Sequence, residues 1–203
     1  MSNPEFEHKQ PFTTEVDWSS EVKDFSAPTR EVLQSLGFET FWLNGQYLED
    51  LLDKKTSEKL LAVYGRFGFD FTNLRTKQSE VAVDRSLFLP NDNGETWQEE
   101  NLQLFHYERE LRSIDNLRSV SVCRGNLADY VAIYSWFLKQ KQHLSGLPYF
   151  ARSLTTDTFY RGNKSLAIKL LDKTVNNEAF QFRNIQMYKD DDDIRLIPII
   201  IPT

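Results

Sequence analysis

The stretch NLADYVAIYSWFLKQKQHL, residues 126–144, decides the fold class. Its large apolar residues recur at helical spacing, so it predicts one long amphipathic helix over 127–144. Asn126 suits the N-cap, and Asp129 complements the free N–H groups of the first turn. One face of this helix is bulky and largely aromatic, carrying Leu127, Tyr130, Val131, Tyr134, Phe137 and Leu138. Such a face needs a broad apolar surface opposite it, and we expect the helix to cross a sheet.

Helical patterns also occupy the N-terminal third of the chain. Ser26 and Pro28 suit the start of a helix, and Gly37 suits its end. Residues 44–64 carry a second helical stripe with a polar break, which predicts one bent helix or two short ones.

The first residues of the chain have no such periodicity. Residues 1–25 are mostly polar and contain Pro4 and Pro11, so we expect an extended N-terminal arm. The remaining residues, 26–203, are expected to form a single α+β domain.

Alternating apolar residues predict strands in the middle of the chain. Residues 81–89 have a period of two, and the composition of 90–94, PNDNG, is typical of a turn. Residues 102–111 are interpreted as the returning strand, with Phe105 and Tyr107 on one side, and 120–122 as another short strand.

The last third of the chain predicts a C-terminal antiparallel β-meander. Its three segments are 165–172, which also fits a helix, then 180–182 and 194–201. Pro198 is expected on an edge strand or at a bulge, since it cannot donate to a ladder. The four carboxylates Asp190 to Asp193 are interpreted as the polar turn that separates the last two strands.

These patterns together predict an α+β fold. We expect an N-terminal helical part packed with a mainly antiparallel sheet, the helix 127–144 across it, and the C-terminal meander.

Composition narrows the class of protein. The chain has 40% hydrophobic and 27% charged residues, which is typical of a globular domain. Cys123 is the single cysteine, so an internal disulfide is excluded and a reducing, cytoplasmic setting is the simplest expectation. The apolar runs are too short for a membrane-spanning helix, so we expect no membrane partner.

Charge is unevenly distributed along the chain. Residues 1–60 hold 12 acidic and 6 basic side chains, whereas residues 101–189 hold 13 basic and 7 acidic ones. The two regions either complement each other inside the fold or leave a basic surface for an acidic partner. Basic residues interleaved with aromatic ones also suit single-stranded nucleic acid. The candidate binding residues are Arg109, Arg112, Arg118, Arg124, Tyr160, Arg161 and Lys164.

Patterns for catalysis and metal binding are weak. His106 with Glu108 forms a conceivable base and orienting carboxylate, and Arg161 a conceivable anion-binding group, in an orphan enzyme. Arg124 beside Cys123 could favour a thiolate, although no base is nominated. Residues 89–100 resemble a calcium loop, but Leu89 stands where the first oxygen ligand belongs. We therefore expect no catalytic residue, no metal site and no cofactor.

The sequence favours a non-catalytic protein-interaction protein, such as an adaptor, an inhibitor or an assembly component. The expected partner is another protein, bound through exposed aromatic and arginine side chains. The first alternative is a nucleic-acid-binding protein that uses the basic and aromatic residues of 101–189. The second alternative is the orphan enzyme built around Arg161.

Overall fold

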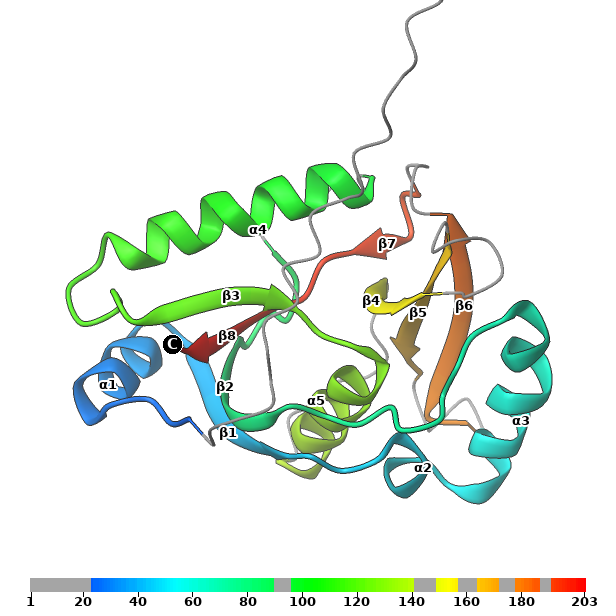
Figure 1. The fold of residues 1–203 in the computed structure, drawn as a ribbon. Helices are drawn as coiled ribbons and strands as arrows, with labels where there is room; N and C mark the ends of the chain where they lie inside the picture. The colour runs from blue at the N-terminus through cyan, green and yellow to red at the C-terminus, as the bar shows by residue number, and fades with distance from the viewer. Residues whose placement is uncertain (1–22, 90–95, 141–148, 157–163, 172–177, 187–190) are drawn as a thin grey trace, which may run out of the picture.

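The computed structural model describes residues 23–89, 96–140, 149–156, 164–171, 178–186 and 191–203. These residues form two four-stranded sheets and five α-helices, which confirms the α+β class (Figure 1). The helices are α1 (Ala27–Ser35), α2 (Leu48–Leu51), α3 (Lys54–Tyr64), α4 (Trp97–Arg112) and α5 (Leu127–Lys139), and a 3-10 turn, η1 (Gly65–Phe67), follows α3. None of the helices within these ranges has the length and apolar character needed to cross a bilayer.

The first sheet is antiparallel throughout. Its strand order is β1-β2-β8-β3, with β1 (Phe38–Asn44), β2 (Gln78–Asp84), β3 (Val120–Arg124) and β8 (Pro198–Pro202). The second sheet has the order β6-β5-β4-β7, with β4 (Phe150–Thr156), β5 (Lys164–Leu170), β6 (Phe180–Gln186) and β7 (Ile194–Arg195). Its strands pair antiparallel except β4 and β7, which pair parallel.

Helix α5 contributes most of its length to the main core. Asn126 and Asp129 form a reciprocal capping box at its start, as the sequence predicted. On one side Phe41 of β1 stacks on Trp136 of α5 with ring centroids 4.4 Å apart. On the other side α5 packs on β4 and β5, and Leu166 shares its core cluster. The predicted crossing of a sheet is therefore confirmed, and the helix joins both sheets into one core.

The C-terminal segment differs from the predicted meander. Residues 180–186 pair with β5, but the chain that follows does not return to β6. β7 adds to β4, and β8 then enters the first sheet between β2 and β3. All five residues of β8 are buried, and this full burial of PIIIP explains the preference for a central position. Pro198 therefore starts a central strand, where its missing donor is tolerated.

The prediction of a returning strand over 102–111 is wrong, since these residues belong to α4. Thr96 caps this helix, because its hydroxyl accepts from the Glu99 backbone N–H. The Glu99 carboxylate in turn accepts from the Thr96 backbone N–H. The inward face carries Leu104 and Leu111, which are buried, whereas Phe105 is exposed. The alternation of Phe105 and Tyr107 misled the interpretation, because α4 carries apolar side chains on both its inner and its outer face.

The N-terminal half and β5 agree with the remaining predictions in part. The stretch 44–64 contains two helices, α2 and α3, which confirms the alternative of two short helices over that of one bent helix. The ambiguous segment 165–172 forms strand β5, and strand β1 was not predicted. The expected arm lies outside the described residues up to residue 22, and so does the turn at 90–94.

The passage from β3 into α5 depends on Gly125. An added Cβ there would lie 2.7 Å from Ile199 Cδ1 and 2.9 Å from Tyr130 Cε1. The backbone N–H of Gly125 also donates to the Tyr130 hydroxyl at 3.1 Å, and that hydroxyl donates to the carbonyl of Ile197 at 2.9 Å. β3, α5 and the entry to β8 thus meet at one close contact.

We predict that Gly125→Ala lowers the free energy of unfolding by about 1–3 kcal/mol, the usual cost of overpacking. Gly65→Ala is the matched control, because its added methyl group meets open space and its φ of −59° is helical. The control should be neutral or stabilise by about 0.4–1 kcal/mol. Guanidinium denaturation monitored by circular dichroism measures both, and equal costs would contradict the close contact.

Candidate functional site

A groove of about 330 Å³ lies between α2, α3 and the segment 71–74. Its floor is apolar, with Leu48 and Leu60 buried and Phe71 and Leu74 partly buried. Leu61 adds an apolar side chain on its rim that is 52% exposed. An exposed apolar rim above a buried apolar floor is suited to receiving an apolar group from outside.

Polar groups complete the rim of the groove. They are the exposed Tyr47 and Glu49, together with Ser57, Thr72 and Asn73. Glu49 is the one ionisable carboxylate among the described lining residues, and no histidine or cysteine accompanies the Ser57 and Thr72 hydroxyls there. The lining therefore offers apolar contact surface, hydroxyl and amide groups, and one carboxylate.

Local hydrogen bonds fix the two walls of the groove. Asp53 caps α3 by accepting from the Thr56 N–H at 2.9 Å and from its hydroxyl at 2.7 Å. The hydroxyl bond and the backbone bond lower the pKa of Asp53. On the opposite wall the Asp70 carboxylate accepts from the Thr72 N–H at 2.8 Å, and the Leu48 N–H donates to the carbonyl of Leu74 at 2.8 Å. One wall is therefore held by a helix cap, and the other by a side-chain turn bond and a backbone bond.

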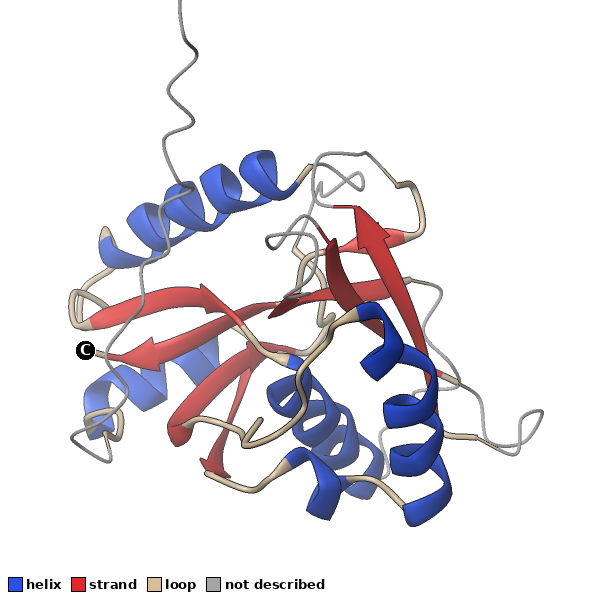
Figure 2. Ribbon diagram, turned by 45° about the vertical axis from the view of Figure 1, so that its right-hand side comes forward, coloured by secondary structure: helices blue, strands red, loops and turns tan. Residues whose placement is uncertain are grey.

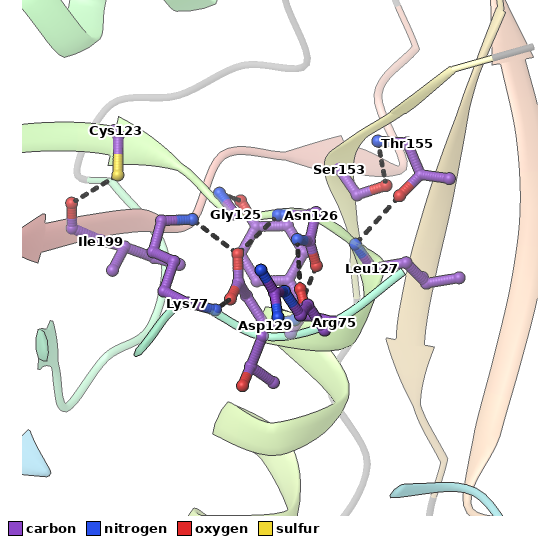
Figure 3. Close-up of polar contacts among 12 residues, drawn as sticks. Arg75, Lys77, Cys123, Gly125, Asn126, Leu127, Asp129, Ser153, Thr155 and Ile199 are labelled. Atoms are coloured by element: carbon purple, nitrogen blue, oxygen red, sulfur yellow. Dashed lines mark hydrogen bonds and ion pairs between the residues drawn. The ribbon is translucent and has the colours of Figure 1, made fainter. Parts of the chain in front are cut away.

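A buried ion pair ties this groove to the core (Figure 3). Lys77 Nζ lies 2.6 Å from Asp129 Oδ2, and the Lys77 backbone N–H donates to Oδ1 of the same carboxylate at 2.8 Å. Asn126 donates its side-chain N–H to the carbonyl of Arg75 at 2.8 Å. Residues 75–77 follow directly on the groove wall, so the start of α5 anchors that wall.

The ionisation of this pair follows from its burial. Burial lowers the pKa of the Lys77 ammonium, but the Asp129 carboxylate outweighs this effect and leaves the pKa above its ordinary value. The Lys77 side chain is therefore an ammonium ion at neutral pH. The Asp129 carboxylate also accepts from the Asn126 backbone N–H at 2.9 Å, so it serves the ion pair and the helix cap at once.

A second buried ionic cluster joins α4 to both sheets. Arg124 Nη2 lies 2.8 Å from Glu100 Oε2, and Arg152 Nε lies 3.5 Å from Glu100 Oε1. The guanidinium of Arg124 also stacks on Trp97, with Cζ 3.7 Å from the ring centroid. α4 supplies Glu100 and Trp97, β3 supplies Arg124 and β4 supplies Arg152, so this cluster fixes the position of α4.

The predicted binding arginines are dispersed by the fold. Arg124 is only 1% exposed, so it belongs to the interior. Arg109 is exposed on α4, and Arg118 is exposed in the turn that follows, near Asp115. Arg112 already uses part of its guanidinium in contacts within the protein, because it donates to the carbonyl of Val120 at 2.8 Å and pairs with Glu108 at 3.1 Å. Arg109, Arg112 and Arg118 lie near one another along the chain, at the C-terminal half of α4 and the turn after it.

The remaining candidates lie elsewhere. Lys164 begins β5 in the second sheet, and Tyr160 and Arg161 lie outside the described residues. The orphan-enzyme and nucleic-acid alternatives both rely on Arg161 and therefore stay predictions.

The residues considered for catalysis are not brought together. His106 is exposed on α4, whereas Glu108 turns toward β3 and accepts from the Val122 N–H at 2.8 Å. The predicted strand over 102–111 would have placed His106 and Glu108 on one face, but the segment is a helix, on which positions two apart point in different directions. Burial raises the pKa of Cys123 to about 11, so its sulfur is a thiol at neutral pH.

The acidic run forms a local turn where it is described. Asp191 accepts from the Asp193 N–H at 3.1 Å and pairs with Arg183 at 2.8 Å, while Arg195 donates to the carbonyl of Asp192. Asp190 lies outside the described residues. The turn leads from β6 toward β7, not between paired strands of one hairpin. Within the described residues no group of three potential ligands could hold a metal ion.

Sequence reasoning missed the groove, because its parts lie in segments separated along the chain. The spacing of Leu60 and Leu61 indicated a helical face, but not that Leu61 stays exposed. The contact between Leu48 and Leu74 could not be inferred from local periodicity.

We predict that Lys77→Met lowers the free energy of unfolding by about 3–5 kcal/mol, because it leaves the Asp129 charge buried without its ammonium partner. Lys54→Met is the matched control, since Lys54 and Glu58 form an exposed pair at 3.9 Å. The Lys54→Met control should lower the free energy of unfolding by less than about 0.5 kcal/mol. Urea denaturation at neutral pH measures both, and a similar small cost for the two variants would contradict a structural role for the pair.

A scan against protein-family models and searches of the curated proteins and of the solved structures each found no match to this chain.

Proposed function

We infer that this protein is a non-catalytic interaction protein that binds a short apolar segment of another protein in the groove between α2 and α3. One observation carries the proposal: Leu61 is 52% exposed on the rim of a groove whose floor, Leu48 and Leu60, is buried. Exposing such a rim is unfavourable for an isolated protein, and covering it provides binding free energy.

The size of the groove sets the kind of ligand. A volume of about 330 Å³ is near the lower end for ligand sites, which suits one or two large apolar side chains. An amphipathic helix or an extended peptide presents such side chains as anchors, with further contacts at the polar rim. The exposed Tyr47 supplies an aromatic ring and a hydroxyl at that rim, and tyrosine is a frequent hot-spot residue.

Charge narrows the partner further. Glu49 lines the groove and Asp50 follows it on α2, and both are exposed. The whole chain carries a net charge of −6. A partner segment with a lysine or arginine beside its apolar anchor therefore complements this rim, and electrostatic attraction also favours the encounter.

The fixed walls support binding without a large rearrangement. Asp53 holds one wall by capping α3, Asp70 holds the other by a turn bond to the Thr72 N–H, and the Lys77–Asp129 pair connects the second wall to α5. A preformed groove avoids part of the ordering cost of association. Adaptor, inhibitor and assembly roles all use such a surface, and the partner decides among them.

We expect a random peptide display library, selected on the folded protein, to enrich peptides with Leu, Phe or Trp beside Lys or Arg. Leu61→Glu should lower the affinity of the selected peptides at least about tenfold, equivalent to 1.4 kcal/mol, because it places a carboxylate at the apolar rim. Titration of a fluorescent synthetic peptide measures the dissociation constant.

Val63→Glu is the matched control, since Val63 is 42% exposed on the same helix but does not line the groove. This variant should change the affinity by less than about twofold, within the range of a remote surface change. A selection without enrichment would refute the proposed groove, and so would peptides that bind the Leu61→Glu variant as tightly as the unchanged protein.

A further inference from the structure

The outer face of α4 carries apolar side chains that no other element among the described residues covers. Phe105 is 63% exposed and Leu102 is 57% exposed, the two highest values among the large hydrophobic residues described. The inner face of the same helix is already used, with Leu104 and Leu111 buried against the first sheet. This face is separate from the α2–α3 groove, since α4 lies on the opposite side of the molecule (Figures 1 and 2).

The exposed residues follow the spacing of a helix–helix seam. Gln98, Leu102, Phe105 and Arg109 are separated by four, three and four residues, and all are exposed. This alternation is the heptad spacing that lines one side of a helix in a coiled coil. The seam has an apolar centre, a neutral polar residue at one end and a cation at the other.

We propose that this seam packs antiparallel against α4 of a second copy of the chain. With the two helices crossing between residues 103 and 104, Leu102 lies against Phe105 of the partner subunit, and the twofold axis repeats this contact. The outer layers then place Gln98 against Arg109 of the partner subunit. A contact of this kind uses the same patch on both subunits, as closed twofold symmetry requires.

Charge complementarity supports a second copy and sets the direction of packing. Glu99 lies in the first turn of α4, while His106 and Arg109 lie in its second half, and all three are exposed. Antiparallel packing brings Glu99 beside His106 and Arg109 of the partner subunit. Parallel packing would instead place Glu99 against Glu99 and Arg109 against Arg109 of the partner subunit. The helix dipoles also oppose one another in the antiparallel arrangement.

Glu99 can form this pair without giving up its role in the cap of α4. Glu99 uses Oε2 for the bonds from the Thr96 N–H at 2.9 Å and from its hydroxyl at 2.6 Å. The cap therefore persists when the second carboxylate oxygen accepts from Arg109 of the partner subunit. The buried Glu100–Arg124 pair fixes the orientation of α4, so the outer face is presented without rearrangement.

The size of the seam predicts a weak dimer. A helix of 16 residues is about 24 Å long, and two such faces cover less area than the roughly 1,200–2,000 Å² of a stable complex. Association should therefore be visible at high protein concentration. Sedimentation velocity from about 1 to about 500 µM spans the range for an interface below that size.

We expect the weight-average sedimentation coefficient of the unchanged protein to rise with concentration. Phe105→Glu should abolish this rise, since it places two carboxylates at the apolar centre, and Phe67→Glu, at an exposed site on η1, should leave it unchanged. Circular dichroism confirms that both variants fold. A monomer at every concentration, or equal association of the Phe105→Glu variant, would overturn the proposal and leave the α2–α3 groove untouched.

Disulfide trapping tests the antiparallel register. In a Cys123→Ser background, a mixture of Gln98→Cys and Arg109→Cys proteins should form a covalent heterodimer under mild oxidation. The two Gln98 positions lie about 16 Å apart along the helix axis in this register, from 11 residues at 1.5 Å each, well beyond the roughly 7 Å limit of a disulfide. Self-crosslinking of Gln98→Cys alone would indicate parallel packing and overturn the proposal, and so would the absence of any crosslink.

Discussion

The ion pair between Lys77 and Asp129 is the interaction on which the rest of the structure depends. Its two charges lie 2.6 Å apart in the interior, where the start of β2, the cap of α5 and the end of β3 meet. Removing two charges from water is costly, and their close attraction and the added backbone bonds offset that cost. The pair holds the start of α5 against the segment that leads into β2, beside the groove wall at 71–74 and the passage through Gly125.

Much of the fold was accessible from the sequence where local physics decides it. The capping box of Asn126 and Asp129, the Ser26 cap with Pro28, and the two helices in 44–64 all follow from spacing and capping chemistry. α4 was mistaken for a strand because apolar residues on two faces of a helix blur its period. A strand was predicted over 194–201, but the central position of β8 in the first sheet could not be predicted, since PIIIP has the same composition at an edge or in a sheet centre.

The candidate site was less accessible, because exposure and pairing across long sequence separations decide it. Arg124 resembles a surface arginine in sequence, yet Glu100, 24 residues earlier, pairs with it in the interior. Leu61 and Leu60 are adjacent and chemically identical, and only their packing makes one the rim and the other the floor of the groove. Phe105 belongs to the seam of α4 and is also one of the two aromatic residues whose alternation obscured the helical period, so the misassignment and the proposed contact share this residue.

The position of β8 has a consequence for the order in which the protein assembles. β2 and β3 do not pair with each other, and both pair with residues 198–202. During synthesis from the N-terminus, β1 and β2 can pair with each other early, but the β3 half of the sheet must wait for residues more than 70 positions later. Such distant pairing slows folding. Until β8 emerges from the ribosome, the edges of β2 and β3 stay open to chaperones or to other chains.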